Sequence, residues 1–187
     1  MSYYVLEVFT SKEEETIKRI KNELDLSFDS YDFFIPKRKR IYKKEGISHE
    51  KIETLFPGYI FIESNDKSMS ILKKNLYQVK TLTRLLGTDK THKDFIAPLT
   101  LDEEYMLNVL LGKDNKKRIV DISHIYLTEG KEIIVVDGPL KGLEGKIVKT
   151  NLHKRKVTVE LNFMNTITTT DLGIDFIEEK IQEKETA

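Results

Sequence analysis

Short apolar runs alternate with segments of helical spacing over the first 111 residues. Tyr3 to Phe9 and Tyr59 to Ile62 are rich in aromatic and β-branched side chains, which is typical of strands. Between them, Ile17, Ile20 and Leu24 recur at spacings of three and four, which predicts one buried face of a helix. This part of the chain therefore mixes strands and helices.

The other elements of this part are predicted from the same two periods. They are a strand over Phe33–Ile41, a polar hairpin over 42–54, a short helix containing Met69, Leu72 and Leu76, a weaker strand over Val79–Leu86, and a helix from Leu101 to Leu111.

Two segments have the pattern of a helix capping box. In Ser11-Lys12-Glu13-Glu14 and in Thr100-Leu101-Asp102-Glu103, the hydroxyl can accept from the N–H three residues on. The glutamate carboxylate can reach back to the N–H of the hydroxyl residue. The resulting order of elements favours an α/β sandwich with an antiparallel sheet.

From Gly130 onward, β-branched runs are separated by glycine turns. This close spacing predicts a small all-β barrel, so the fold class is α+β with an N-terminal sandwich and a C-terminal barrel. We expect domains at 1–111 and 129–180 and a linker at 112–128, whose basic residues are solvated. The five candidate strands are Ile133–Val136, Lys146–Thr150, Lys156–Leu161, Thr166–Thr170 and Phe176–Glu178.

Composition excludes several classes of protein. The chain has no cysteine, so disulfide-stapled modules, thiolate zinc sites and cysteine nucleophiles are excluded. Its longest purely aliphatic run, Ile133 to Val136, is far shorter than a membrane span, and no signal peptide is evident, so we expect a soluble cytoplasmic protein.

No catalytic or metal-binding pattern stands out either. The four histidines, His49, His92, His124 and His153, are too far apart in sequence for a spaced metal-ligand motif. Carboxylates are scattered, and no Ser/His/Asp arrangement is evident. We expect neither an enzyme nor a cofactor.

The net charge is zero, with 31 basic and 31 acidic residues, but two segments are strongly basic. Residues 36–44 carry six positive charges and no negative one, and residues 141–156 carry six against the single acid Glu144. Each run alone is compatible with a solvated charged face. Two such runs on a neutral chain favour surfaces aimed at a polyanion.

The segment Asp137 to Val148 is dense in glycine, with Gly138, Gly142 and Gly145 between two apolar strands. A phosphate-binding loop would need glycine and a hydroxyl where the chain has Leu140 and Ile147. We therefore interpret the segment as a tight turn of the barrel.

This turn resembles a KOW motif, and the N-terminal part resembles the NGN domain of NusG-type elongation factors. The marker of the second resemblance is Leu55-Phe56-Pro57-Gly58-Tyr59-Ile60-Phe61-Ile62-Glu63. Together the two resemblances cover roughly residues 2 to 178.

One turn departs from the housekeeping members, which carry Phe-Gly-Arg in the barrel. Here Phe163 is followed by Met164 and Asn165. Leu161-Asn162 before it makes this turn similar to that of the specialised paralogs. Among these paralogs, the composition, which is rich in lysine and isoleucine and poor in alanine, favours the LoaP-type antiterminators. Some paralogs store the barrel as a helical hairpin. The β-branched content of this segment predicts that it stays a barrel.

The resemblance implies a factor that grips the clamp helices of RNA polymerase, suppresses pausing and termination, and is recruited by a leader RNA hairpin. The resemblance also implies that the protein is a monomer and that upstream DNA is a further candidate partner. The residues it implies for polymerase binding are Tyr4, Leu55, Phe56, Pro57, Gly58 and Tyr59.

For nucleic acid we expect phosphate contacts rather than base reading, because lysine outnumbers arginine. Two alternatives stay open: a housekeeping factor that couples polymerase to the ribosome or Rho, and a ribosome-associated KOW protein that binds structured rRNA. The candidate contacts are Lys37, Arg38, Lys39, Arg40, Lys43, Lys44, Lys141, Lys146, Lys149, His153, Lys154, Arg155 and Lys156.

Overall fold

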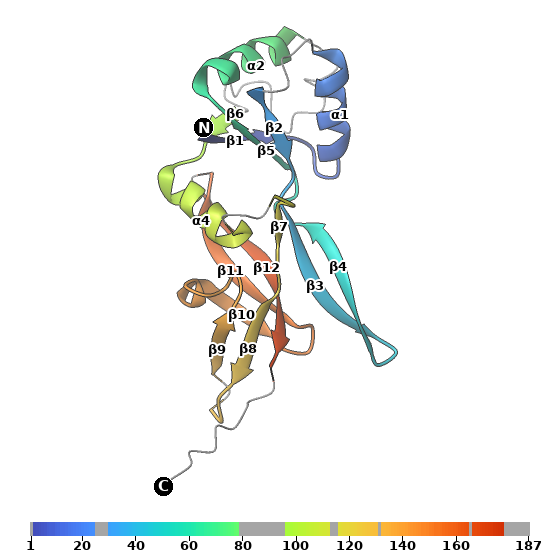
Figure 1. The fold of residues 1–187 in the computed structure, drawn as a ribbon, viewed down its shortest axis with the longest axis vertical. Helices are drawn as coiled ribbons and strands as arrows, with labels where there is room; N and C mark the ends of the chain where they lie inside the picture. Colours follow the sequence, from blue (N-terminus) through green and yellow to red (C-terminus); the bar gives the residue numbers. More distant parts are fainter. Residues whose placement is uncertain are drawn as a thin grey trace.

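The computed structural model describes residues 2–24, 30–78, 96–112, 116–130, 132–164 and 166–177. A helix-covered sheet forms the N-terminal end, a curled sheet forms the C-terminal part, and a long hairpin runs beside the latter (Figure 1). This mixed α+β architecture confirms the predicted fold class.

The N-terminal sheet has four antiparallel strands in the order β2-β5-β1-β6. Its two faces belong to different clusters, because side chains alternate along each strand. Tyr4 and Leu6 pack on the helical side, whereas Val5 and Phe61 point to the other side. The elements are β1 (Ser2–Glu7), α1 (Glu13–Glu23), β2 (Asp32–Phe34), β5 (Tyr59–Ser64), α2 (Asp66–Gln78) and β6 (Ile96–Pro98).

A hairpin of β3 (Lys37–Lys44) and β4 (Ile47–Thr54) leaves this sheet through Pro36. Strand β7 (Ile119–Val120) pairs in parallel with β3. Helix α4 (Leu101–Leu111) lies at the joint between the two parts (Figure 1).

The C-terminal sheet has the order β10-β11-β12-β8-β9, with β12 parallel to β8 and the other pairs antiparallel. It is built from strands, as predicted: Lys146 ends the single turn η2, and the residues after it form β10. The elements are β8 (Ser123–Leu127), β9 (Ile133–Asp137), η2 (Glu144–Lys146), β10 (Ile147–Asn151), β11 (Lys156–Phe163) and β12 (Thr166–Phe176).

Several predicted boundaries were wrong for non-local reasons. Phe33–Ile41 is not one strand, because Pro36 divides it between two sheets. Phe176–Glu178 is not a separate strand, since β12 continues unbroken to Phe176, where its end pairs with β8. Strands β6, β7 and β8 were missed, and the last two fall in the segment predicted as a linker. The predicted strand Val79–Leu86 lies outside the described residues.

The two capping boxes had different outcomes. At α4 the box is present: Glu103 N donates to Thr100 Oγ1 at 3.3 Å, and Thr100 N donates to Glu103 Oε2 at 2.8 Å. At α1 the prediction was wrong, because Lys12 occupies the N-cap and makes no side-chain cap.

Within the described ranges, no helix is long and apolar enough to cross a membrane.

Candidate functional site

The aromatic edge around Phe56 lies inside a contact between the two parts of the chain. Phe56 is only 4% exposed, and Phe163 at the end of β11 stacks on it with ring centroids 4.7 Å apart and planes 12° apart. Phe163 also meets the edge of Tyr59 at 5.2 Å and stacks on Phe61 at 5.7 Å. Four aromatic rings from both parts therefore form one cluster.

Hydrogen bonds surround this cluster. Met164 N donates to Glu103 Oε1 at 2.7 Å, so the carboxylate that caps α4 also holds the tip of the β11–β12 turn. Thr170 Oγ1 donates to the Leu55 carbonyl at 3.2 Å and accepts from Arg38 Nη1 at 2.7 Å. The C-terminal sheet is thus docked by both apolar and polar contacts.

The close approach of β12 to β3 depends on Gly173. A Cβ at this position would lie 2.6 Å from the Lys39 carbonyl oxygen and 3.3 Å from the Arg40 Cα. Real Cβ atoms essentially never approach backbone so closely, so any other residue would separate the strands.

The Leu55–Tyr59 turn has a fixed shape. Gly58 adopts φ +87°, and its N–H donates to the buried Glu13 Oε1 at 2.6 Å. Its carbonyl accepts from Val8 N at 2.8 Å. Pro57 is the exposed residue of the turn, whereas Leu55 and Phe56 are buried.

Tyr4 lies on the opposite face of the sheet from Phe56. Its hydroxyl donates to Asp66 Oδ1 at the start of α2. Burial raises the pKa of Tyr4 to about 12, with further contributions from the hydrogen bond to Asp66 and its charge. The structure therefore does not bring Tyr4 together with the Phe56 edge.

Acidic residues neutralise much of the first basic run. Arg38 and Arg40 both pair with Glu53 on β4, at 3.6 Å and 3.4 Å, and Arg40 lies 3.9 Å from Asp171 on β12. Lys37 pairs with Glu14 at 3.4 Å and Lys39 pairs with Asp121 at 3.0 Å. The run also includes Lys43 and Lys44, at the end of β3.

The side chains of the second run fall into two groups, those with a polar partner and those without a carboxylate partner. Arg155 pairs with Asp175, Lys156 pairs with Asp171, and Lys141 Nζ donates to the Val136 carbonyl at 3.0 Å. The remaining four side chains are exposed and have no carboxylate partner among the described residues: Lys146, Lys149, His153 and Lys154.

The structure brings the two basic runs together in one groove. Arg40 and Tyr42 of β3 line it on one side, and the β10–β11 turn with Lys154 and Arg155 lines the other. The groove has a volume of about 590 Å³.

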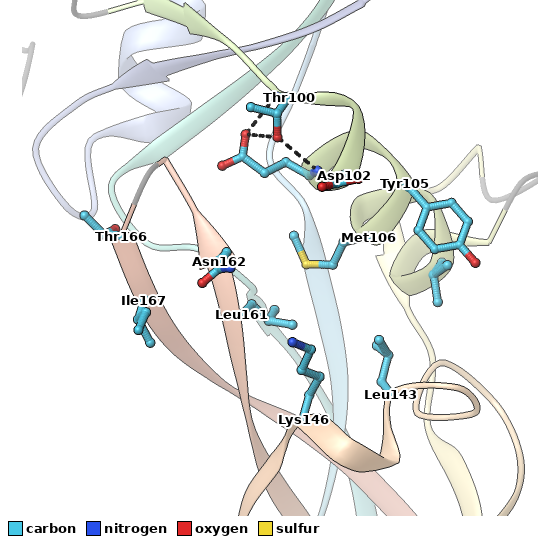
Figure 2. A pocket seen from close by; sticks show the side chains of 12 residues that line it. Thr100, Asp102, Tyr105, Met106, Leu143, Lys146, Leu161, Asn162, Thr166 and Ile167 are labelled. Atoms are coloured by element: carbon cyan, nitrogen blue, oxygen red, sulfur yellow. Dashed lines mark hydrogen bonds between the residues drawn. The ribbon is translucent and has the colours of Figure 1, made fainter.

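A second cleft, of about 620 Å³, lies between α4 and the C-terminal sheet. Figure 2 shows Met106 of α4 on one wall, Leu143 and Lys146 on another, and the capping hydrogen bonds at Thr100 on the rim. Its lining combines apolar side chains with polar and charged ones, among them Asp102, Glu103 and Lys146.

The histidines that the structure describes do not form a metal site, and no group of three possible ligands occurs in the described ranges. His124 Nδ1 lies 2.6 Å from Asp137 Oδ1, and His49 stacks on Tyr42. His92 lies outside the described residues.

Sequence reasoning missed two residues that connect separate elements of the chain. Arg118 contacts the N-terminal sheet, and Gly173 allows β12 to approach β3. Arg118 was expected to be solvated, but its guanidinium lies 4.3 Å from the centroid of Phe34 and pairs with Asp32 at 3.1 Å and Glu63 at 2.5 Å. The polar, charged segment 112–118 contains no motif that would predict these contacts of Arg118. Phe163 was noted as part of an unusual turn, but not as the partner of Phe56.

Comparison with known proteins gives matches to both parts of the chain. The family model described as transcription termination factor NusG matches residues 1–107, more than half of the chain, and the KOW motif matches residues 129–161. Similar curated proteins bear the name transcription termination/antitermination protein NusG.

Three of these relatives show the extent of the similarity. The Streptococcus pyogenes serotype M1 protein is 23% identical over 179 residues, which is 92% of each chain. The Haemophilus influenzae protein is 22% identical over 180 residues, 94% of this chain and 92% of the relative. The Lactococcus lactis protein is 28% identical over 116 residues, 62% of this chain and 58% of the relative.

Proposed function

Because the chain belongs to the NusG family, whose members are non-enzymatic transcription termination/antitermination factors that bind RNA polymerase, we propose that the polymerase contact is made through the Leu55–Tyr59 turn. The observation that carries this proposal is the aromatic cluster at Phe56. It is an apolar surface on the N-terminal part that the C-terminal sheet covers with Phe163. Such a surface suits an apolar protein partner, since aromatic anchors dominate binding energy at interfaces.

Polymerase binding at this turn requires the C-terminal sheet to move away. Phe56 is buried under Phe163, and two partners cannot stack on the same ring face. The apparent affinity for polymerase then equals the affinity of the open form multiplied by the fraction of molecules that are open.

The second part of the proposal is recruitment by a leader RNA element. Lys146, Lys149 and Lys154 support it, because they are exposed on the C-terminal sheet and its turns without a carboxylate partner among the described residues. Lysine ammonium groups suit phosphate contacts and the shape of an RNA hairpin. The first basic run contributes less in the docked form, because acidic side chains form ion pairs with Lys37, Arg38, Lys39 and Arg40.

Within the family, we assign the chain to the specialised antiterminators of the LoaP type. Met164 and Asn165 stand where housekeeping members carry Gly-Arg, which argues against a housekeeping member. The composition, rich in lysine and isoleucine and poor in alanine, favours the LoaP type. Met164 has φ +54°, a left-handed conformation that glycine would adopt more easily. The housekeeping function is the second candidate, and the name shared by the similar curated proteins favours it.

A polymerase capture assay tests the first part. Immobilised core RNA polymerase should retain more Phe163→Ala protein than wild type, because the aromatic edge is uncovered. Phe56→Ala should reduce retention in the same assay. Equal retention of the wild type and both variants would exclude this edge as the contact.

A further inference from the structure

We infer that the groove between the β3–β4 hairpin and the β10–β11 turn binds single-stranded RNA, with a base stacked on Tyr42 and phosphates near Lys154. This inference deepens the nucleic-acid part of the proposed function and rests on it. Neither basic run predicts the groove alone, since Tyr42 and Lys154 are far apart in sequence and only the docked arrangement brings their elements together.

The groove has a suitable size. Its volume of about 590 Å³ lies within the roughly 300–1,000 Å³ that is usual for pockets that hold small organic ligands, which is also the scale of a nucleotide. It is an open surface groove, as a continuous strand would require, and the hairpin that forms one wall runs beside the C-terminal sheet (Figure 1).

The groove presents exposed aromatic rings. Tyr42 is 46% exposed, and its ring stacks on His49, its cross-strand partner, with centroids 5.4 Å apart and planes 25° apart. The imidazole therefore supports one face of the ring and leaves part of the ring open to solvent. Phe176, which is 36% exposed, lies in the same groove. Unpaired bases stack on such rings with little regard to sequence, because every base has a π-face.

The charge of the lining matches a polyanion. Three cations line the groove, Arg40, Lys154 and Arg155, and none of the lining residues is acidic. Two of these cations form ion pairs with acidic residues that do not line the groove: Arg40 pairs with Glu53, and Arg155 pairs with Asp175. Lys154 is the exposed one without a carboxylate partner among the described residues, so it is the best placed for a phosphate.

Stacking distinguishes a single strand from other polyanions. A duplex offers phosphates but keeps its bases paired, so it would leave Tyr42 without a role. An acidic peptide would satisfy Lys154 but has no base to stack. RNA rather than DNA is assigned because the proposed function recruits the factor through a leader transcript. The displaced DNA strand of a transcription bubble is the competing single strand, and the thymidine decamer below represents it.

Both parts of the chain contribute walls to this groove, so a strand bound in it stabilises the docked arrangement. Polymerase binding at Phe56 favours the open arrangement. Single-stranded RNA in the groove and polymerase at the edge therefore oppose each other, whereas a folded leader element can engage Lys146 and Lys149 outside the groove.

The test is fluorescence anisotropy of a labelled ten-nucleotide uridine RNA with the full chain at about 50 mM salt. Tyr42→Ala should weaken binding roughly tenfold or more, the effect of losing one stacked base. Tyr42→Phe should retain most of the affinity, because the ring remains. Lys154→Ala should weaken binding and lower the slope of log K against log salt by about 0.7.

Two matched controls lie outside the groove. Tyr105 is 73% exposed on α4, and Lys74 is exposed on α2. Tyr105→Ala and Lys74→Ala should leave decamer affinity unchanged, and circular dichroism should show that all variants are folded. An effect of Tyr105→Ala equal to that of Tyr42→Ala would overturn the assignment to this groove.

Three further results would overturn the inference. They are unchanged affinity of Tyr42→Ala, equal affinity for a ten-base-pair RNA duplex or for a thymidine decamer, and displacement of the RNA by an equimolar ten-residue polyglutamate. The assay contains no polymerase, so failure here leaves the polymerase contact intact. A structured RNA that still binds through Lys146 and Lys149 would show that RNA recruitment survives without the groove.

Discussion

The Phe163 ring lies flat on the Phe56 ring, 4.7 Å away between centroids, and joins the two parts of the chain at the edge we propose for polymerase. The two apolar faces belong to one continuous cluster that includes Val5 and Phe61 of the N-terminal sheet and Val159 of the C-terminal one. Exposing such a surface costs free energy in proportion to its apolar area. The docked state is therefore an intrinsic competitor of any apolar partner.

Truncation of each ring should have a different effect on polymerase binding. Phe163→Ala and Phe56→Ala should each lower the free energy of unfolding by up to about 3–5 kcal/mol, because both rings are buried. Only Phe56→Ala should also weaken binding to polymerase, by about 2 kcal/mol or more if Phe56 is an anchor. Urea unfolding and polymerase capture measure the two effects separately. Weaker capture by Phe163→Ala would mean that the docked form is the one that binds.

Gly173→Ala should loosen the docking without changing an aromatic ring. The added Cβ would lie 2.6 Å from the Lys39 carbonyl oxygen, and backbone cannot yield as a flexible side chain can. We expect a loss of about 1–3 kcal/mol in the free energy of unfolding and a larger radius of gyration by X-ray scattering. Gly145→Ala is the matched control, since Gly145 has open space around its Cβ position and is not among the positive-φ glycines. If both variants behave alike, the close approach of β12 and β3 is not needed for docking.

These residues show which features could be predicted from sequence. The Thr100–Glu103 capping box is local, so its pattern was sufficient. The Ser11–Glu14 pattern failed because Ser11 adopts φ +68° and lies outside the helix cap, while the Glu14 carboxylate pairs with Lys37, a partner 23 residues away. Local patterns contain no information about such partners.

The same reasoning applies to the candidate site. The basic runs were visible in the sequence, but their neutralisation was not, because Asp171 reaches Arg40 only through the docking of β12 beside β3. The stacking of Phe163 on Phe56 likewise depends on the arrangement of the two parts. The polymerase and RNA contacts remain predictions.

Acid should weaken the ion-pair network that joins β3, β4 and β12. Burial acts to raise the pKa of Glu53, but the Lys51 hydrogen bond and the Arg40 charge outweigh it, so the pKa lies below its usual value. Burial also opposes ionisation of Asp171, but hydrogen bonds from Lys156 and Thr158 prevail and lower its pKa.

A lowered folded-state pKa stabilises the fold fully above the unfolded values, about 3.9 for Asp and 4.3 for Glu. That contribution is lost as the pH falls through the folded-state pKa. We therefore expect the free energy of unfolding to decrease from about pH 5 downward, and Asp171→Asn to flatten this dependence. Glu160→Gln, at an exposed position of β11, is the control. Urea titrations at several pH values measure the slope. A slope unaltered by Asp171→Asn would show that this carboxylate does not link stability to pH.

Salt dependence should separate exposed lysines from paired ones in binding to a structured leader RNA. The exposed group is Lys146, Lys149 and Lys154, and replacing all three by alanine should flatten the slope of log K against log salt by about 2, at roughly 0.7 per phosphate contact. Over a fourfold increase in salt, the wild type should then lose about 20-fold more affinity than the triple variant. Lys39→Ala should change the slope little, because Lys39 already pairs with Asp121 at 3.0 Å.

Filter binding at several salt concentrations gives these slopes, with an unrelated RNA of equal length to measure preference. If Lys39→Ala flattens the slope as much as the loss of one exposed lysine, the chain opens on RNA and frees the first basic run for phosphates.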